Sequence, residues 1–266
     1  HRDLHSFPTR RSSDLVAVDG LSLVRDTLFG INDTIPIDYY VKPSHIGAAQ
    51  GSFANIPEIA NAYEHYFGAY PWNRIGYIET DQGCMEHVTN IAYVSSAING
   101  NLSYEWLAAH ELSHMWFGNK VTCASAEDMW LNEGWAVFCE SMYREYLYGK
   151  ASYNANMRSK INNVIKNCHS IDGGYYAVYG IPNSLTYGET VYQKGGVVVH
   201  TLRNYMGDSL FFPTVKAYLD TFAYHYASTE EMKNFFSNYS GLNMDDFFDG
   251  WRSEERRVGK ECRSRW

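Results

Sequence analysis

The chain has 266 residues, of which 45% are hydrophobic and 20% charged, a composition that excludes a disordered or fibrous protein. Its formal net charge of −8 argues against nucleic acid as a partner. Apolar runs such as those at residues 197–199 and 210–212 are far shorter than the roughly 20 residues that cross a bilayer, so no membrane span is expected.

Both ends of the chain resemble translated sequencing adapter. The DNA sequence AGATCGGAAGAGCG encodes the start of residues 252–266, and its reverse complement, CGCTCTTCCGATCT, encodes residues 11–15. We therefore expect residues 1–15 and 252–266 to be non-native tails that are disordered and dispensable. Between the tails, 13 basic residues stand against 25 acidic ones, which strengthens the case against nucleic acid.

Strand-like and helical segments alternate in the first part of the chain. Residues 16–35 are expected to be a linker or the end of a preceding β domain. Alternation over residues 35–42 predicts a strand, and helical spacing over 48–67 predicts a helix. Two further strands are expected at 72–80 and 85–95, because these segments are rich in Ile, Val, Tyr and Thr and turn residues separate them.

The rest of the chain has helical spacing. Ser103 is expected to cap a helix that ends at Gly118, and Asp128 to cap another that ends at Gly149. A Gly- and Tyr-rich segment, residues 171–188, is expected to be an irregular loop. Further helices are expected at residues 152–168, 189–206, 208–222, 229–239 and 243–250. A small mixed sheet followed by helices predicts an α+β fold.

Four cysteines lie between the tails: Cys84, Cys123, Cys139 and Cys168. None forms a Cys-x-x-Cys pair, so a thiolate zinc site is not supported. A single disulfide between Cys123 and Cys139 stays open as an alternative, and so does the redox compartment.

The segment His110-Glu111-Leu112-Ser113-His114 is the strongest functional signal. Histidines at positions i and i+4 of a helix share one face, so both imidazoles can reach one metal ion. Glu111 lies about 100° further round the helix, where it can reach a water molecule beside the metal. Because such a motif arises by chance in roughly one chain in fifty of this composition, two ordinary helix-face histidines are a fair alternative.

Glu133 favours the metal site over that alternative. It lies on the next predicted helix, with 18 residues between it and His114. Two histidines and one glutamate with an open fourth position form a catalytic zinc geometry. We therefore predict one Zn²⁺ per chain, bound by His110, His114 and Glu133, with Glu111 as general base.

This pattern, His-Glu-x-x-His followed by Asn132-Glu133-Gly134, resembles the gluzincin metallopeptidases of the aminopeptidase N and leukotriene-hydrolase family. The resemblance extends over nearly all of residues 16–251. It implies a thermolysin-like metallopeptidase catalytic domain for residues 36–251.

Two further segments are similar to motifs of that family. Residues 83–87 resemble its Gly-x-Met-Glu-Asn segment, which binds substrate. In this chain the segment consists of Gly83, Cys84, Met85, Glu86 and His87. The resemblance implies that Glu86 binds the free amino group of the substrate, whereas His87 replaces the usual Asn. Residues 192–195 resemble the Tyr-x-Lys-Gly motif, which implies that Tyr192 stabilises the transition state.

The predicted function is zinc-dependent hydrolysis of the N-terminal peptide bond, with a peptide that has a free N-terminus as the partner. A thermolysin-like endopeptidase is the first alternative, because it shares the zinc site and has no need for Glu86. A zinc-bound, non-catalytic peptide-binding module is the second, although such a module has no use for Glu111. The wider family also includes an epoxide hydrolase activity, to which nothing in the sequence points.

Overall fold

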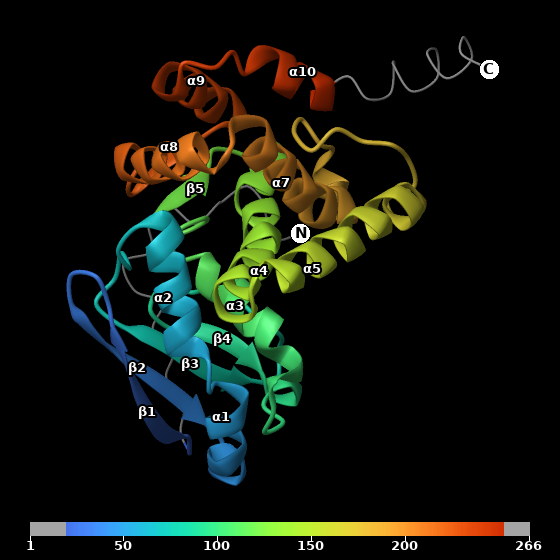
Figure 1. Ribbon diagram of the computed structural model, residues 1–266. Helices are drawn as coiled ribbons and strands as arrows, with labels where there is room; N and C mark the ends of the chain where they lie inside the picture. The colour runs from blue at the N-terminus through green and yellow to red at the C-terminus, as the bar shows by residue number, and fades with distance from the viewer. Residues whose placement is uncertain (1–19, 253–266) are drawn as a thin grey trace. The chain divides into compact units, whose positions relative to one another are not determined.

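The computed structural model describes residues 20–252 (Figure 1). The predicted tails, residues 1–15 and 252–266, lie outside this range except for Arg252, the last residue of helix α10. The chain forms two compact units that divide in the sequence between Asn119 and Lys120, and each is described by itself. A small mixed sheet comes first and helices follow, which confirms the predicted α+β fold.

The first unit contains a four-stranded sheet with the strand order β1-β2-β3-β4. Its strands are Ser22–Phe29 (β1), Thr34–Val41 (β2), Ile75–Thr80 (β3) and Ile91–Val94 (β4). β1 is antiparallel to β2, whereas β2, β3 and β4 are parallel. Residues 22–29, expected in a linker or at the end of a preceding β domain, instead form an edge strand of this sheet. They do so because a tight turn, with the Gly30 N–H donating to the Asp33 carbonyl at 3.0 Å, pairs them with β2.

The helix expected over residues 48–67 is divided in two. α1 is Ile46–Ser52 and α2 is Ile56–Phe67, with Pro57 in the first turn of α2. Proline has no N–H and its ring collides with the carbonyl four residues earlier, so a helix starts at this position and does not run through it. Phe53, in the break, turns into the core and stacks on Tyr39 with ring centroids 4.5 Å apart. In Figure 1, α2 lies along one face of the sheet.

Three buried tyrosines fix α3, Glu105–Ser113, against this unit. They come from α2, β3 and β4, and each hydroxyl donates to a backbone carbonyl of α3 or of the turn before it. The bonds are Tyr63 to Ala109 (3.0 Å), Tyr77 to Ala108 (2.8 Å) and Tyr93 to Tyr104 (3.1 Å). Because buried hydroxyls are costly to leave unpaired, these bonds fix the position of α3 relative to α2 and the sheet.

α3 is shorter than expected. Ser103 does not cap it; the Asn101 side chain accepts from the Ser103 N–H at 2.9 Å and caps a 3₁₀ turn, Leu102–Tyr104, that leads into the helix. The helix ends at Ser113, five residues before Gly118. Trp116 and Phe117, which were expected to continue it, are buried in the core instead.

The second unit is mainly helical. Its helices are Glu133–Tyr148 (α4), Lys150–Asn163 (α5), His169–Ile171 (α6), Gly195–Met206 (α7), Asp208–Thr221 (α8), Thr229–Ser240 (α9) and Asp245–Arg252 (α10). α4 packs against both α5 and α7, and α8 packs against α9 (Figure 1). The helices expected at 208–222, 229–239 and 243–250 are confirmed to within two residues.

The predicted cap at Asp128 is wrong. A 3₁₀ helix, Ala126–Leu131, precedes α4, and α4 begins at Glu133. The Asp128 carboxylate instead accepts from the N–H and the hydroxyl of Thr229, at 2.9 and 2.7 Å, at the start of α9. The side chain therefore serves a helix that lies about 100 residues later in the chain.

Two strands and two π-helical turns were not predicted. Val121–Cys123 (β5) and His225–Ala227 (β6) form a parallel pair of three residues each, too short to show a period. Val164–Cys168 extends α5 as a π-helix, and Thr190–Lys194 is a π-helix that leads into α7. The loop expected at 171–188 is irregular apart from a short 3₁₀ turn, Asn183–Leu185.

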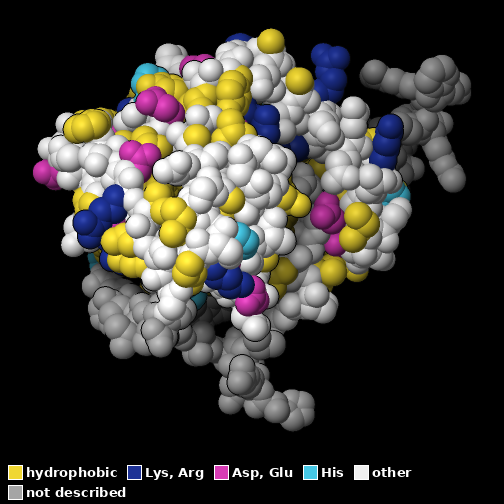
Figure 2. Space-filling model, turned by 90° about the horizontal axis from the view of Figure 1, so that it is seen from below, with side chains coloured by type: hydrophobic (Ala, Val, Ile, Leu, Met, Phe, Trp, Pro, Cys, Tyr) yellow, Lys and Arg dark blue, Asp and Glu magenta, His cyan; other side chains and the backbone are white. Residues whose placement is uncertain are grey.

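The four described cysteines are free thiols, so the alternative disulfide between Cys123 and Cys139 does not form. None of the described helices combines the length and apolarity that a bilayer crossing requires. On the face shown in Figure 2, the described Lys and Arg side chains are scattered among acidic and apolar ones and form no continuous basic surface.

Candidate metal centre

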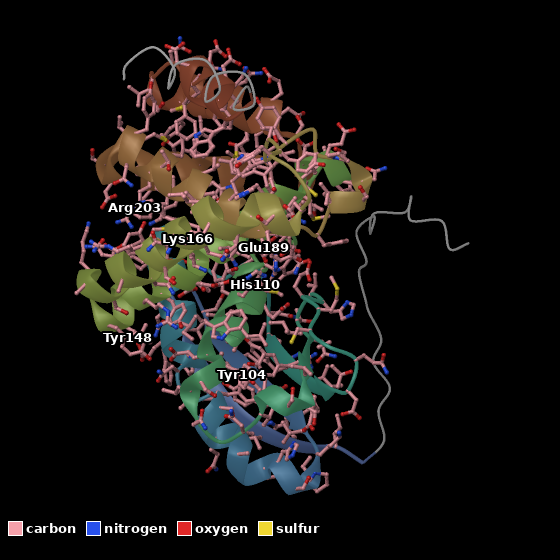
Figure 3. All side chains as sticks on the ribbon, turned by 90° about the vertical axis from the view of Figure 1, so that its right-hand side faces the viewer. Tyr104, His110, Tyr148, Lys166, Glu189 and Arg203 are labelled. Atoms are coloured by element: carbon pink, nitrogen blue, oxygen red, sulfur yellow. The ribbon has the colours of Figure 1, made fainter. Side chains whose placement is uncertain are left out.

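The two histidines of the metal motif lie on one face at the end of α3. His110 is in the last turn of α3, and His114 is its C-cap residue. Their ring centroids are 5.0 Å apart and their planes are inclined at 78°. Both side chains are buried, and Figure 3 shows His110 on α3. The spacing of four residues thus brings the two imidazoles together as predicted.

One hydrogen bond orients His114. Its Nδ1 lies 2.8 Å from the carbonyl oxygen of Phe117, which can only accept, so Nδ1 carries the proton and donates. Nε2 is then the ring nitrogen of His114 that can serve as a metal ligand. Metal-ligating histidines commonly use their other ring nitrogen in this way, because the bond fixes both the tautomer and the ring orientation.

The donor set suits zinc. His110, His114 and Glu133 each offer one ligand atom, and these atoms lie within 4.8 Å of one another. All three residues are buried, with exposed fractions of 7%, 1% and 6%. Two imidazole nitrogens and one carboxylate oxygen match a catalytic zinc site that keeps one position open. Glu133 is the first residue of α4.

A second group of ligand-type atoms includes the predicted base. One atom each of Glu86, Glu111 and His114 lies within 4.8 Å of the others. Glu111 is buried and Glu86 half-buried. Two carboxylates beside a histidine of the metal motif can serve two purposes, since one can accept a proton and the other can bind a cation.

The segment at residues 83–87 is not a regular strand, so the strand expected over 85–95 is correct only for residues 91–94. Met85 forms an isolated antiparallel bridge with Ala92, with N–H···O distances of 3.1 and 2.9 Å. The chain then turns, since the N–H of His87 bonds back to the Met85 carbonyl at 2.9 Å. Glu86 thus lies at a bend in the backbone.

Asn119 joins this bend to the metal motif, a role that the sequence did not reveal. Its side-chain amide donates to the Glu86 carbonyl at 2.7 Å, and its own N–H donates to the His114 carbonyl at 2.9 Å. Because one residue bonds to both backbones, the positions of Glu86 and His114 are linked. Asn119 lies outside every motif considered, so no sequence signal pointed to it.

Cys84 and Gly83 serve the backbone of the bend. Gly83 has φ of +108°, a conformation that L side chains rarely adopt. Burial raises the pKa of the Cys84 thiol to about 11, although its sulfur accepts from the Val94 N–H at 3.4 Å. The thiol is therefore protonated at neutral pH, as expected of a compact filler.

Tyr192 lies in the π-helix of the second unit, and a close backbone contact ties this segment to the start of α4. A Cβ added to Gly134 would lie 2.8 Å from the Cα of Gly195 and 3.2 Å from the carbonyl oxygen of Val191. The Asn-Glu-Gly and Tyr-x-Lys-Gly motifs therefore touch through their glycines. Each motif ends in Gly, which could have indicated a close backbone contact, but no structural role was predicted for either glycine.

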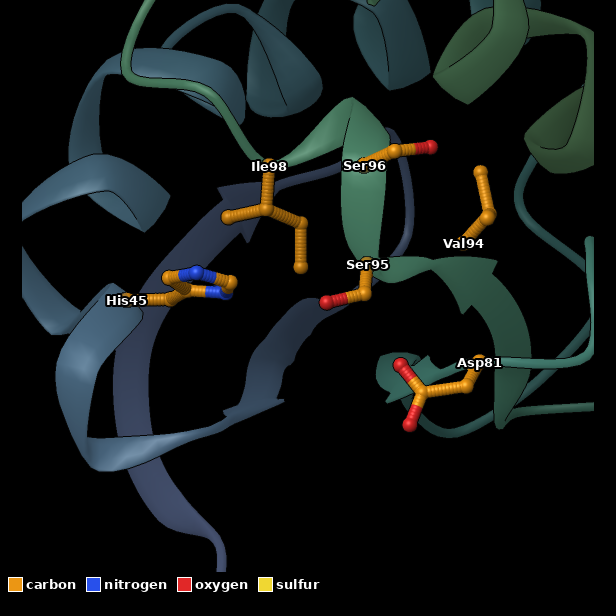
Figure 4. Close-up of a pocket in the computed structure, with 6 residues that line it drawn as sticks. All are labelled: His45, Asp81, Val94, Ser95, Ser96 and Ile98. Atoms are coloured by element: carbon orange, nitrogen blue, oxygen red, sulfur yellow. The ribbon is translucent and has the colours of Figure 1, made fainter.

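A separate cavity of about 540 Å³ lies at the carboxyl ends of β3 and β4 (Figure 4). His45, Asp81 and Ser95 are among the six residues that line it. Behind them is buried Glu79, which accepts from Ser95 Oγ, from the Lys42 N–H at 2.7 Å and from His45 Nδ1 at 2.9 Å. Burial would raise the pKa of Glu79, but these hydrogen bonds and nearby His45 outweigh it and lower that pKa. None of the predicted site residues lines this cavity.

Known proteins match this chain in sequence. The family model described as "Peptidase family M1 domain" matches residues 53–251. The aminopeptidase B of Mus musculus is 28% identical over 214 residues, which cover 75% of this chain and 33% of that protein. The leukotriene A-4 hydrolase of Xenopus laevis is 24% identical over 260 residues, which cover 82% of this chain and 41% of that protein. The chain thus spans well under half the length of these relatives.

Solved structures share the fold. A two-domain M1 zinc metallopeptidase bound to L-tryptophan matches with a TM-score of 0.75 at 19% identity, covering 87% of this chain and 51% of that one. An M1 zinc metallopeptidase from Deinococcus radiodurans, bound to a Tyr-Ser-Ala substrate, matches with a TM-score of 0.73 at 19% identity, covering 86% of this chain and 51% of that one. These likenesses confirm the fold expected from the sequence.

Proposed function

Because this chain belongs to peptidase family M1, we propose that it is a zinc-dependent aminopeptidase, which hydrolyses the N-terminal bond of peptides. The observation that carries the proposal is the buried donor set of His110, His114 and Glu133 with the carboxylate of Glu111 beside His114. A metal site without catalysis has no need for that additional carboxylate. The Tyr-Ser-Ala substrate held by a solved relative supports peptides as the substrate class.

We assign the metal to His110 Nε2 or Nδ1, His114 Nε2 and one oxygen of Glu133. A bound zinc ion supplies a Lewis acid, which polarises the scissile carbonyl and makes water more acidic. His114 is prepared for this task, because the Phe117 carbonyl holds the proton of His114 on Nδ1.

Glu111 is the proposed general base. Its carboxylate accepts a proton from the water that attacks the scissile carbonyl, and it then returns the proton to the departing amine. Glu111 follows His110 in the sequence and therefore projects from a different part of the helix surface, so it does not compete with the two imidazoles for the metal ion.

Glu86 is proposed to make the enzyme an exopeptidase. Its carboxylate lies within 4.8 Å of ligand-type atoms of Glu111 and His114, where it can bind the ammonium group of a peptide N-terminus. A charge-assisted bond at this point fixes the distance from the N-terminus to the scissile carbonyl. Residues 83–87 supply the bent backbone that carries this carboxylate, and His87 sits next to it.

Tyr192 is proposed to donate a hydrogen bond to the oxyanion that forms on the scissile carbonyl. A phenol hydroxyl is a suitable donor because the interaction strengthens as negative charge develops in the transition state. The family resemblance of residues 192–195 supports this assignment, and so does the contact between the start of α4 and the π-helix. We propose that residues 36–251 form most of the catalytic domain, and that β1, which precedes them and pairs with β2, adds the edge strand of its sheet.

The decisive experiment measures fluorophore release from a panel of aminoacyl and N-acetylated aminoacyl substrates, with and without a chelator. An aminopeptidase cleaves the free-amine substrates much faster than the N-acetylated ones, loses activity with the chelator and regains it with added zinc. Cleavage of N-blocked peptides as fast as of free-amine peptides would instead identify an endopeptidase of the thermolysin type. Zinc binding without any hydrolysis would identify a peptide-binding module.

A further inference from the structure

A buried carboxylate from outside the π-helix holds the start of the segment that carries Tyr192. Asp172 accepts from the N–H of Glu189 at 3.0 Å, and from the N–H and hydroxyl of Thr190 at 2.7 and 2.6 Å. Asp172 is 9% exposed and Thr190 1%. Three N–H and O–H groups of residues 189 and 190 converge on one carboxylate that lies 17 and 18 residues earlier in the chain, and the Cys168 thiol donates to it at 3.9 Å.

This arrangement replaces a missing helix cap. The first N–H groups of a helix have no partner within it, and a side chain at the N-cap usually supplies one. Here the N-cap residue, Glu189, makes no side-chain cap. The Asp172 carboxylate accepts from the N–H groups of Glu189 and Thr190 instead, and its negative charge suits the positive end of the helix formed by Thr190–Lys194 and α7.

Other bonds hold the same segment on both sides of Tyr192. Cys168 Sγ lies 3.4 Å from Thr190 Oγ1, and the Asn163 amide donates to Glu189 at 3.1 Å, so the two π-helical turns are joined. Lys166 and Glu189 mark these turns in Figure 3. Beyond Tyr192, the buried Lys194 ammonium donates to the Tyr176 carbonyl at 2.6 Å.

We propose that Asp172 is a positioning residue for Tyr192, and this proposal rests on the oxyanion role proposed for that tyrosine. A π-helical turn contains one more residue than an α-helical turn, so the direction of its side chains depends on keeping the wider turn. Asp172 bonds to the first residue of that turn, two positions before Tyr192. Loss of these bonds would allow the turn to relax, and the Tyr192 hydroxyl would leave the position in which it meets the transition state.

A double-mutant cycle tests the coupling. Asp172→Asn keeps the shape of the side chain but replaces one acceptor oxygen with an NH₂ group, which would face the N–H and O–H donors of Glu189 and Thr190. We therefore expect kcat to fall at least about tenfold, with KM changed less than about twofold. In the Tyr192→Phe background the same substitution should change kcat by less than about twofold, since no hydroxyl remains to be positioned. Zinc content should stay at the parental value in all four proteins.

Thr190 offers a milder version of the test. Thr190→Val removes the hydroxyl bond to Asp172 at nearly constant volume, and we expect a smaller fall in kcat that also disappears in the Tyr192→Phe background. Thr190→Ser keeps the hydroxyl and should restore most of the parental kcat. This pair keeps the proposal testable if Asp172→Asn does not fold.

Asp128 is the matched control, because its carboxylate also accepts from the N–H and hydroxyl of a threonine, Thr229. Asp128→Asn should lower the melting temperature, while any effect on kcat should be the same in the parent and Tyr192→Phe backgrounds.

Equal effects of Asp172→Asn in both backgrounds would overturn the proposal and make Asp172 a purely structural residue, with the aminopeptidase assignment intact. An unchanged kcat in Tyr192→Phe alone would overturn the oxyanion role of Tyr192 and this proposal with it.

Discussion

At the scale of single residues, one hydrogen bond prepares His114 for a metal. The bond from Nδ1 to the Phe117 carbonyl fixes the tautomer and the ring orientation, so binding through Nε2 requires neither a change of tautomer nor a rotation of the ring. We expect His114→Ala to lose stoichiometric zinc, whereas the parent binds one zinc per chain. Metal analysis after dialysis measures both values, and parental zinc content in the variant would remove His114 from the ligand set.

Glu111→Gln separates binding from catalysis. The amide keeps the size of the side chain but cannot accept a proton, so zinc content should match that of the parent while kcat falls by about 10²- to 10⁴-fold. Initial rates with a free-amine substrate give kcat, and metal analysis of the same sample gives the zinc content. Activity near that of the parent would show that another group is the base.

Glu86 should decide whether the enzyme requires a free N-terminus. Removing one partner of a partly buried charge pair costs roughly 2 to 5 kcal/mol, so Glu86→Ala should lower kcat/KM for free-amine substrates at least about tenfold. N-acetylated substrates cannot form the pair, and their slow turnover should hardly change. The ratio of the two rates is the measurement, and a ratio equal to that of the parent would favour the endopeptidase alternative.

The chemistry-bearing residues were easier to predict than the residues that support them. Helical spacing, which depends on local geometry alone, was enough to predict the roles of His110, Glu111 and His114. Asn119 and Asp172 could not be found in this way, because each acts through hydrogen bonds to backbone groups distant in sequence. Any Asn or Asp can make such bonds, so the residue type carries no signal.

At the scale of secondary structure, the carboxyl ends of the parallel strands contain a pH-sensitive element. The pKa of Glu79 is lowered below the ordinary value of 4.5, so its contribution to stability is complete above that pH and is lost as the pH falls through the lower, folded-state pKa. The difference in the free energy of unfolding between the parent and Glu79→Gln should therefore be largest at about pH 5 and above, and it should shrink toward pH 3. Urea titrations at several pH values measure it, and a constant difference would contradict the assignment.

Helix boundaries departed from prediction where tertiary contacts override periodicity. Helical spacing continues through residues 48–67, but Pro57 and the burial of Phe53 divide the segment. The π-helical turn at Thr190–Lys194 follows the same rule, since its amphipathic spacing reads as an ordinary helix. The order of sheet and helices was predictable because it rests on many residues, whereas each boundary rests on one or two.

At the scale of the whole molecule, the described fold lies between the two segments that resemble sequencing adapter. If those segments are not native, they were never selected to pack against the rest of the chain. Trimming residues 1–15 and 253–266 should therefore change the melting temperature by less than about 2 °C, a shift expected of substitutions without structural effect. Differential scanning fluorimetry of both proteins makes the comparison, and a large drop would show that the segments belong to the fold.

The contact between Gly134 and Gly195 has a consequence for how the second unit can vary. A methyl group on either glycine would collide with main-chain atoms of the other helix, and main-chain atoms cannot rotate out of the way. A larger residue at one position cannot be accommodated by a smaller one at the other, because both are already glycine. Main-chain contact thus couples the two motifs, and Glu133 and Tyr192 are expected to shift together whenever either helix is displaced.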